Sequence, residues 1–126
     1  MQRIYLVDDD RFLLDMYALK FKSAGVEVLA CQGGADVLEK LREGNPPDAI
    51  LLDIVMPEVD GFAVLEAIRR ENLAPKTKVI ILSNQGQDTD IDRAKKLGAA
   101  GYIVKASAIP SEVLEQTKKI LSGTAA

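Results

Sequence analysis

The chain has 126 residues, a net charge of −3, one cysteine and no histidine. This length suits a single domain, and one cysteine excludes an internal disulfide. The lack of histidine excludes imidazole catalysis and histidine-ligated zinc within the chain. Basic residues are scattered, so we expect no direct contact with nucleic acid. No apolar run reaches membrane-spanning length and no signal-peptide core follows Met1, so we expect a cytoplasmic protein without a membrane contact.

The first half of the chain alternates between apolar strands and helices. The continuous apolar run of residues 4–7 predicts a buried strand, and a helical stretch over about 12–23 follows and ends at Gly25. A second strand is expected over 26–31, and it contains Cys31, which we expect to be buried. A helix over 35–42 and a strand over 48–52 come next, separated by a proline pair.

The second half repeats this pattern. A helix is expected over 62–70, a buried strand over 79–82, a helix over 87–97 with few large apolar residues, a strand over 101–104 and a helix over 110–121. Strict alternation of five apolar strands with five helices predicts an α/β fold, with a doubly wound five-stranded parallel sheet in the flavodoxin-like order 2-1-3-4-5. We expect one domain over residues 1–122 and a short flexible tail over 123–126.

Carboxylates stand at the ends of two of these buried strands. Asp8, Asp9 and Asp10 close the first strand, and Asp53 closes the third. If the two strands are neighbours, the acids meet at the carboxyl edge of the sheet, where like charges raise one another's pKa unless a cation is present. Ligands that are all oxygen suit Mg²⁺, with Mn²⁺ as a substitute. The pattern predicts a Mg²⁺-dependent phosphoryl site.

Two further polar residues end strands at the same predicted edge. Ser83 follows residues 79–82, and Lys105 follows residues 101–104. A hydroxyl donor and an ammonium group both bind phosphoryl oxygens. Taken alone, Ser83 is more typical of a turn and Lys105 of an exposed surface, but their placement beside the acids indicates phosphate binding.

These residues resemble the receiver domain of bacterial two-component response regulators across essentially the whole chain. The most specific element is the segment Asp53-Ile54-Val55-Met56-Pro57-Glu58-Val59-Asp60-Gly61. The resemblance implies that Asp53 is the phosphoacceptor. It implies ligands for Mg²⁺ from Asp8, Asp9, Asp53 and the main-chain oxygen of Val55. It also implies phosphoryl-binding and switch roles for Ser83, Lys105 and Tyr102, and control of the phosphoryl lifetime by Val55, Asn84 and Gln85.

The resemblance also implies partners. It points to a stand-alone receiver similar to chemotaxis regulators, a signalling phosphoacceptor rather than an enzyme, with its own self-phosphorylation and self-dephosphorylation chemistry. Because the chain has no histidine, a separate histidine kinase or histidine phosphotransfer protein must be the donor. A downstream protein partner or output domain would recognise the surface formed by 87–97, 101–104 and 110–121, which is also a possible homodimer surface.

Three residues depart from the usual pattern of that family. Ala106 replaces the common proline after the lysine, so we predict a trans Lys105–Ala106 bond. Asn84 replaces a small residue, and Ser83 replaces the commoner threonine. An apolar Val55 offers no group to orient water, which predicts slow self-dephosphorylation.

Two other functions remain open at this point. In an aspartyl-phosphate phosphatase similar to haloacid dehalogenases, Asp8 would be the nucleophile and Asp10 the acid/base, and Asp53 would be incidental. In a pseudo-receiver, the chain would bind partners without ever carrying phosphate, although every charged site residue is present.

Overall fold

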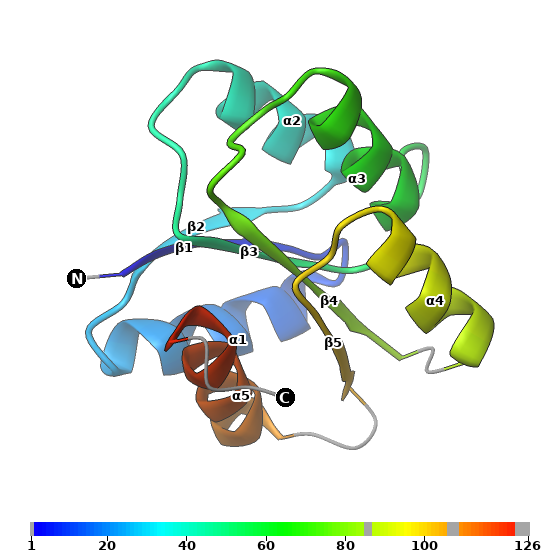
Figure 1. Cartoon of the computed structure of the whole chain (residues 1–126). Coiled ribbons are helices and arrows are strands. Elements are labelled where there is room, and N and C mark those ends of the chain that lie inside the picture. The colour runs from blue at the N-terminus through cyan, green and yellow to red at the C-terminus, as the bar shows by residue number, and fades with distance from the viewer. Residues whose placement is uncertain (1, 85–86, 106–108, 123–126) are drawn as a thin grey trace.

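The computed structural model describes residues 2–84, 87–105 and 109–122 of the chain. Strands and helices alternate from one end to the other (Figure 1). The strands are β1 Arg3–Val7, β2 Glu27–Cys31, β3 Ala49–Leu52, β4 Lys78–Ser83 and β5 Gly101–Val104. The helices are α1 Arg11–Ser23, α2 Gly34–Arg42, α3 Gly61–Arg70, α4 Asp88–Lys96 and α5 Pro110–Ser122. The bounds differ from the predicted ones by one residue at most ends, and Ser83 is the last residue of β4 rather than the first beyond it.

All strand pairs are parallel, and the sheet order is β2-β1-β3-β4-β5. The predicted doubly wound sheet is therefore confirmed. Within β1, Val7 is level with Cys31 of β2 and with Leu52 of β3. The residues that follow Val7 and Leu52 consequently leave the sheet side by side, at its carboxyl edge.

Helices cover both faces of the sheet (Figure 1). Helices α1 and α5 pack on one face, against strand residues such as Ile4 and Leu6. Helices α2, α3 and α4 lie on the other face, against residues such as Tyr5 and Val7. Successive strand residues point to opposite faces, and both faces are buried, so the strands are apolar throughout rather than alternating.

Aspartate side chains cap the first turns of two helices, α1 and α3. The Asp10 carboxylate accepts hydrogen bonds from the main-chain N–H groups of Phe12 and Leu13, which caps α1. The Asp60 carboxylate accepts a hydrogen bond from the N–H of Ala63, which caps α3. Both caps lie directly after the loops that carry the acids, so helix formation fixes where those loops end.

Three further predictions concern the chain outside the site. Cys31 is buried with 1% of its surface exposed, as predicted, and burial raises the pKa of its thiol to about 12. Helix α4 is described in full, and Ala94 is its only buried residue, which confirms weak apolar anchoring. Over residues 2–84, 87–105 and 109–122, the structure has no helix long and apolar enough to span a membrane. The Lys105–Ala106 bond, Gln85 and the tail lie outside the described residues.

Candidate functional site

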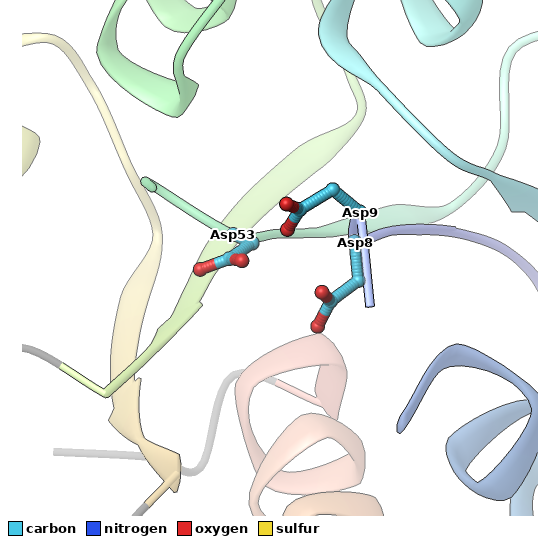
Figure 2. A group of neighbouring side chains, drawn as sticks. All are labelled: Asp8, Asp9 and Asp53. Atoms are coloured by element: carbon cyan, nitrogen blue, oxygen red, sulfur yellow. The ribbon is translucent and has the colours of Figure 1, made fainter. Parts of the chain in front are cut away.

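Three carboxylates meet at the carboxyl edge of β1 and β3. One carboxylate oxygen from each of Asp8, Asp9 and Asp53 lies within 4.8 Å of the other two. Asp8 and Asp53 are only 4% and 7% exposed, whereas Asp9 is exposed to solvent. Figure 2 shows the three side chains gathered at one place, as the sequence predicts. Such an all-oxygen group, largely removed from water, has the donor chemistry that Mg²⁺ requires.

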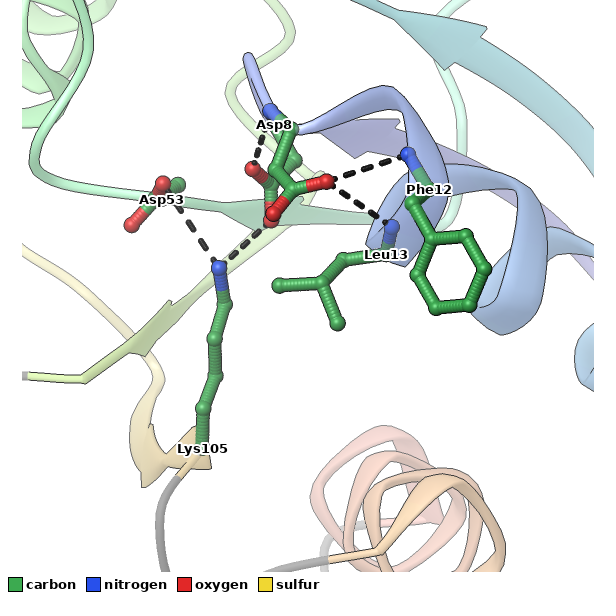
Figure 3. Close-up of polar contacts among 6 residues, drawn as sticks. Asp8, Phe12, Leu13, Asp53 and Lys105 are labelled. Carbon is green, nitrogen blue, oxygen red and sulfur yellow. Dashed lines mark hydrogen bonds and ion pairs between the residues drawn. The ribbon is translucent and has the colours of Figure 1, made fainter.

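Lys105 is the cation among these acids. It follows β5, and its side chain is 6% exposed. Its Nζ lies 2.5 Å from Asp8 Oδ2 and 3.6 Å from Asp53 Oδ2 (Figure 3). Burial lowers the pKa of Lys105, but the hydrogen bond to Asp8 and the charges of Asp53 and Asp8 outweigh it, and the net pKa is raised. Lys105 is therefore an ammonium ion, and its pairing with Asp8 was not foreseen from the sequence.

Burial and the charge of Lys105 act in opposite directions on the pKa of Asp53. Burial raises the pKa of its carboxyl most, the charge of Lys105 lowers it, and the charges of Asp8 and Asp9 raise it again. The net pKa is about 6. The sequence predicted this rise from repulsion between acids alone, whereas loss of solvent is the larger cause.

Asp10 is not one of the three clustered carboxylates, although it is adjacent to Asp9 in the chain. Its N–H donates a hydrogen bond of 2.9 Å to Asp8 Oδ1, which orients Asp8. Its own carboxylate accepts from the N–H groups of Phe12 and Leu13, at 3.0 and 3.2 Å. This carboxylate is engaged in capping α1, which counts against an acid/base role for Asp10 and so against the phosphatase alternative.

The loop between β3 and α3 is tightly packed behind Asp53. The N–H of Gly61 donates to the carbonyl of Ile54 at 2.9 Å. A Cβ at position 61 would lie 2.4 Å from the main-chain oxygen of Asp53, so this close approach requires glycine. The side chain of Val55 is 56% exposed and points no polar group at the site. The loop therefore fixes Asp53 through backbone contacts.

Ser83 is the last residue of β4, and Tyr102 lies within the neighbouring strand β5. Ser83 is fully buried, and Tyr102 is half-buried. Burial and the charge of Asp90 raise the pKa of Tyr102, whereas a side-chain hydrogen bond with Ser83 lowers it. The two residues that the resemblance assigns to switching are thus in contact with each other.

An open pocket of about 420 Å³ joins these residues. Its lining residues are Asp8, Asp9, Asp10, Leu13, Asp53, Val55, Ser83, Asn84 and Lys105. Leu13 was not singled out from the sequence, where it looks like any other apolar residue of α1. Tyr102 does not line the pocket, so it reaches the site through Ser83.

Comparisons with known proteins agree with this site. The family model described as "Response regulator receiver domain" matches residues 4–117. The chemotaxis protein CheY of Thermotoga maritima is 34% identical over 94% of this chain and 97% of that protein. The chemotaxis protein CheY of Bacillus subtilis is 35% identical over 95% and 98%, respectively. A CheY-like receiver domain from Methanospirillum hungatei superposes with a TM-score of 0.88 at 27% identity, covering 98% of this chain and 96% of that one.

The family model matches most of the chain, and two relatives are more than 30% identical over nearly their whole length. The three carboxylates at the carboxyl edge of the sheet agree with these matches. The chain belongs to the response regulator receiver family, the phosphoacceptor domains of two-component signalling, and is CheY-like over nearly its whole length.

Proposed function

We propose that Asp53 is the residue that accepts the phosphoryl group, in a reaction that depends on Mg²⁺. The observation that carries this proposal is the convergence of Asp8, Asp9 and Asp53 beside Lys105. A carboxylate oxygen of Asp53 forms a bond to phosphorus while the bond from phosphorus to the donor's imidazole nitrogen breaks. That nitrogen keeps the bonding electron pair, so the donor imidazole leaves intact.

The residues present fit a magnesium ion. Asp8, Asp9, Asp53 and the main-chain oxygen of Val55 would hold it, and Mn²⁺ would substitute. When bound, the ion offsets the repulsion between the carboxylates and the incoming phosphoryl oxygens. Lys105 and Ser83 would contact the phosphoryl group directly. In the structure Lys105 Nζ already lies 3.6 Å from Asp53, so a short movement away from Asp8 suffices.

Intact mass spectrometry after treatment with acetyl phosphate and Mg²⁺ tests this proposal. We expect one phosphoryl adduct that maps to Asp53, is absent in EDTA and is absent from Asp53→Asn. An adduct that forms equally well in EDTA, or that maps to Asp8, would favour the phosphatase alternative. No adduct under any condition would favour the pseudo-receiver.

We further propose that the adduct is long-lived. Val55 lines the pocket with an exposed apolar side chain, and Asn84 lines it from the end of β4. The isopropyl group of Val55 has no polar atom to orient an attacking water. Gln85, the third residue assigned to lifetime control, lies outside the described residues. Replacing Val55 with asparagine should accelerate loss of the adduct, and an unchanged decay rate would contradict this explanation.

A phosphohistidine-bearing protein is the proposed donor, and α1 supports this choice. Phe12, Met16 and Leu19 are 78%, 36% and 69% exposed and follow one another at helical spacing, so they form an apolar stripe on α1. A protein that brings its phosphoryl group to Asp53 must cover the pocket rim where α1 begins. The stripe starts at that rim, because Leu13, next to Phe12, lines the pocket.

Comparing a protein donor with a small-molecule donor distinguishes an effect on docking from an effect on the phosphorylation reaction itself. Phe12→Ser and Leu19→Ser should slow transfer from a phosphorylated histidine phosphotransfer domain by roughly tenfold each, because central apolar anchors commonly contribute more than 1 kcal/mol. The same variants should accept phosphate from acetyl phosphate at the wild-type rate. Equal slowing with both donors would show that the stripe acts on the pocket rather than on the partner.

We propose that the surface formed by α4, β5 and α5 signals phosphorylation to a partner. Ser83 ends β4 and Tyr102 lies in β5, so their hydrogen bond links the pocket to this surface. A downstream partner or an output domain, or a second copy of the chain in a homodimer, would bind there. We propose a cytoplasmic location, a receiver domain over residues 1–122, and an intrinsic chemistry that consists of self-phosphorylation by small donors and slow self-dephosphorylation.

A further inference from the structure

Helix α4 is attached to α3 by a stacked arginine. The guanidinium carbon of Arg93, on α4, lies 4.2 Å from the ring centroid of Phe62, on α3. An Arg93 Nη2 atom also lies 3.5 Å from Glu66 Oε1, one turn further along α3. Ala94 is the only buried residue of α4, every residue of which is described, so this polar and aromatic contact adds to a small apolar anchor.

A second arginine holds the same, carboxyl-terminal end of α4. Arg69, near the end of α3, donates from Nε to the carbonyl of Leu97 at 2.8 Å and from Nη2 to the carbonyl of Gly98 at 2.9 Å. These carbonyls lie at the carboxyl end of α4, where a cation is favoured by the helix dipole. Gly98 has φ +89°, and any Cβ there would collide with the Arg69 guanidinium. The glycine thus makes room for the arginine.

The Arg93–Phe62 contact is adjacent to the Asp53 loop, because Phe62 directly follows Gly61. Phe62 is 4% exposed and follows Gly61, whose Cα approaches the Asp53 carbonyl so closely that no side chain fits between them. The Asp53 loop, Phe62 and Arg93 are thus connected in series, through Gly61 and the stacked ring. Movement of α4 has to break or shift the stacking before it can proceed.

We propose that Arg93 and Arg69 form a latch that holds α4 in its resting position, and that Phe62 couples this latch to the Asp53 loop. The latch resists displacement of α4 and so sets how readily the chain adopts its phosphorylated conformation. The coupling to phosphorylation rests on the function proposed above, whereas the holding of α4 does not.

The stacking on Phe62 contributes more to the latch than the ion pair with Glu66. The side chains of Arg93 and Glu66 are 56% and 49% exposed, and ion pairs in such positions contribute little. The planar guanidinium over a buried ring is a stronger contact, and a lysine ammonium does not reproduce it. Arg93→Lys therefore keeps the charge and replaces the planar stacking by a weaker cation–π contact at most, while Glu66→Gln removes the ion pair and keeps the stacking.

Amide hydrogen exchange on the free protein in EDTA tests the latch. In Arg93→Lys, amides of α4 should exchange about fivefold faster, which corresponds to loss of roughly 1 kcal/mol of local stability. In Glu66→Gln the change should stay below about twofold. Arg42→Met is the matched control, because Arg42 bridges α2 to Glu71 at the end of α3 and does not touch α4. It should leave α4 exchange unchanged.

Beryllofluoride with Mg²⁺, as a phosphoryl mimic, tests the coupling. If the latch opposes the phosphorylated conformation, Arg93→Lys should bind beryllofluoride about fivefold more tightly, by reciprocity between the two equilibria. Unchanged α4 exchange in Arg93→Lys would overturn the latch. Faster exchange with unchanged beryllofluoride affinity would overturn the coupling. Failure of the wild type to bind beryllofluoride would count against the proposed function and the coupling, and the exchange result on the free protein would still decide the latch.

Discussion

Replacing Asp53 with asparagine should stabilise the protein in the absence of metal. Asp53 is 7% exposed, and its carboxylate loses more through burial than it gains from Lys105, as its raised pKa shows. Asparagine has nearly the same shape and carries no charge. The substitution therefore removes an unfavourable buried charge from the folded state.

The magnitude follows from the pKa. The folded value is about 6 and the ordinary value is 3.8. Each pKa unit corresponds to about 1.4 kcal/mol, so ionised Asp53 destabilises the fold by roughly 3 kcal/mol above pH 6. The sign follows because the folded chain holds the proton more tightly than the unfolded chain. The penalty is absent below the unfolded pKa, grows as pH rises and is complete above the folded pKa.

Urea denaturation in EDTA measures this effect. We expect Asp53→Asn to be more stable than the wild type by about 3 kcal/mol at pH 7.5 and by only about 1 kcal/mol at pH 4.5. Asp92→Asn, an exposed change on α4, is the control and should stay within about 0.5 kcal/mol of the wild type at both pH values. Saturating Mg²⁺ should stabilise the wild type more than Asp53→Asn, because the variant lacks one ligand.

Two results would refute this reasoning. A variant no more stable than the wild type at pH 7.5 would mean that Lys105 fully compensates the buried charge. A stability difference that does not shrink between pH 7.5 and pH 4.5 would mean that it arises from packing rather than from the ionisation of Asp53.

The remaining predictions concern the loop, the thiol and an exposed ion pair. Gly61→Ala places a Cβ against the Asp53 backbone and should slow Mg²⁺-dependent phosphorylation by acetyl phosphate roughly 10- to 100-fold. Gly33→Ala, where a Cβ meets nothing within 4 Å, should react at nearly the wild-type rate, and equal rates for both variants would contradict the packing argument. With its pKa near 12, Cys31 should be alkylated by iodoacetamide at pH 8 about 1,000-fold more slowly in the folded chain than in urea. The hydrogen bond from Arg42 lowers the pKa of Glu71, so Glu71→Gln should lower the melting temperature at neutral pH and lose this effect as pH falls through the folded pKa of Glu71.

The sequence alone determined the architecture. Uninterrupted apolar strands alternating with helices allow few arrangements, because each strand must be covered on both faces and each crossover must be right-handed. The same pattern predicted that Asp8, Asp9 and Asp53 would meet, since neighbouring parallel strands end at one edge of the sheet. The carboxylate group in the structure confirms that prediction.

Only the tertiary structure decided how the individual side chains are engaged. Asp10 is as acidic as its neighbours, yet its carboxylate caps α1, and Lys105 contacts Asp8 across a separation of 97 residues. The Arg93–Phe62 stacking and the Arg69 cap likewise depend on how α3 and α4 pack. Hydrophobic periodicity specifies which face of an element is buried, but it carries no information about which long polar side chain will reach which partner. Those choices depend on distances of a few ångströms between elements that the chain brings together only when it folds.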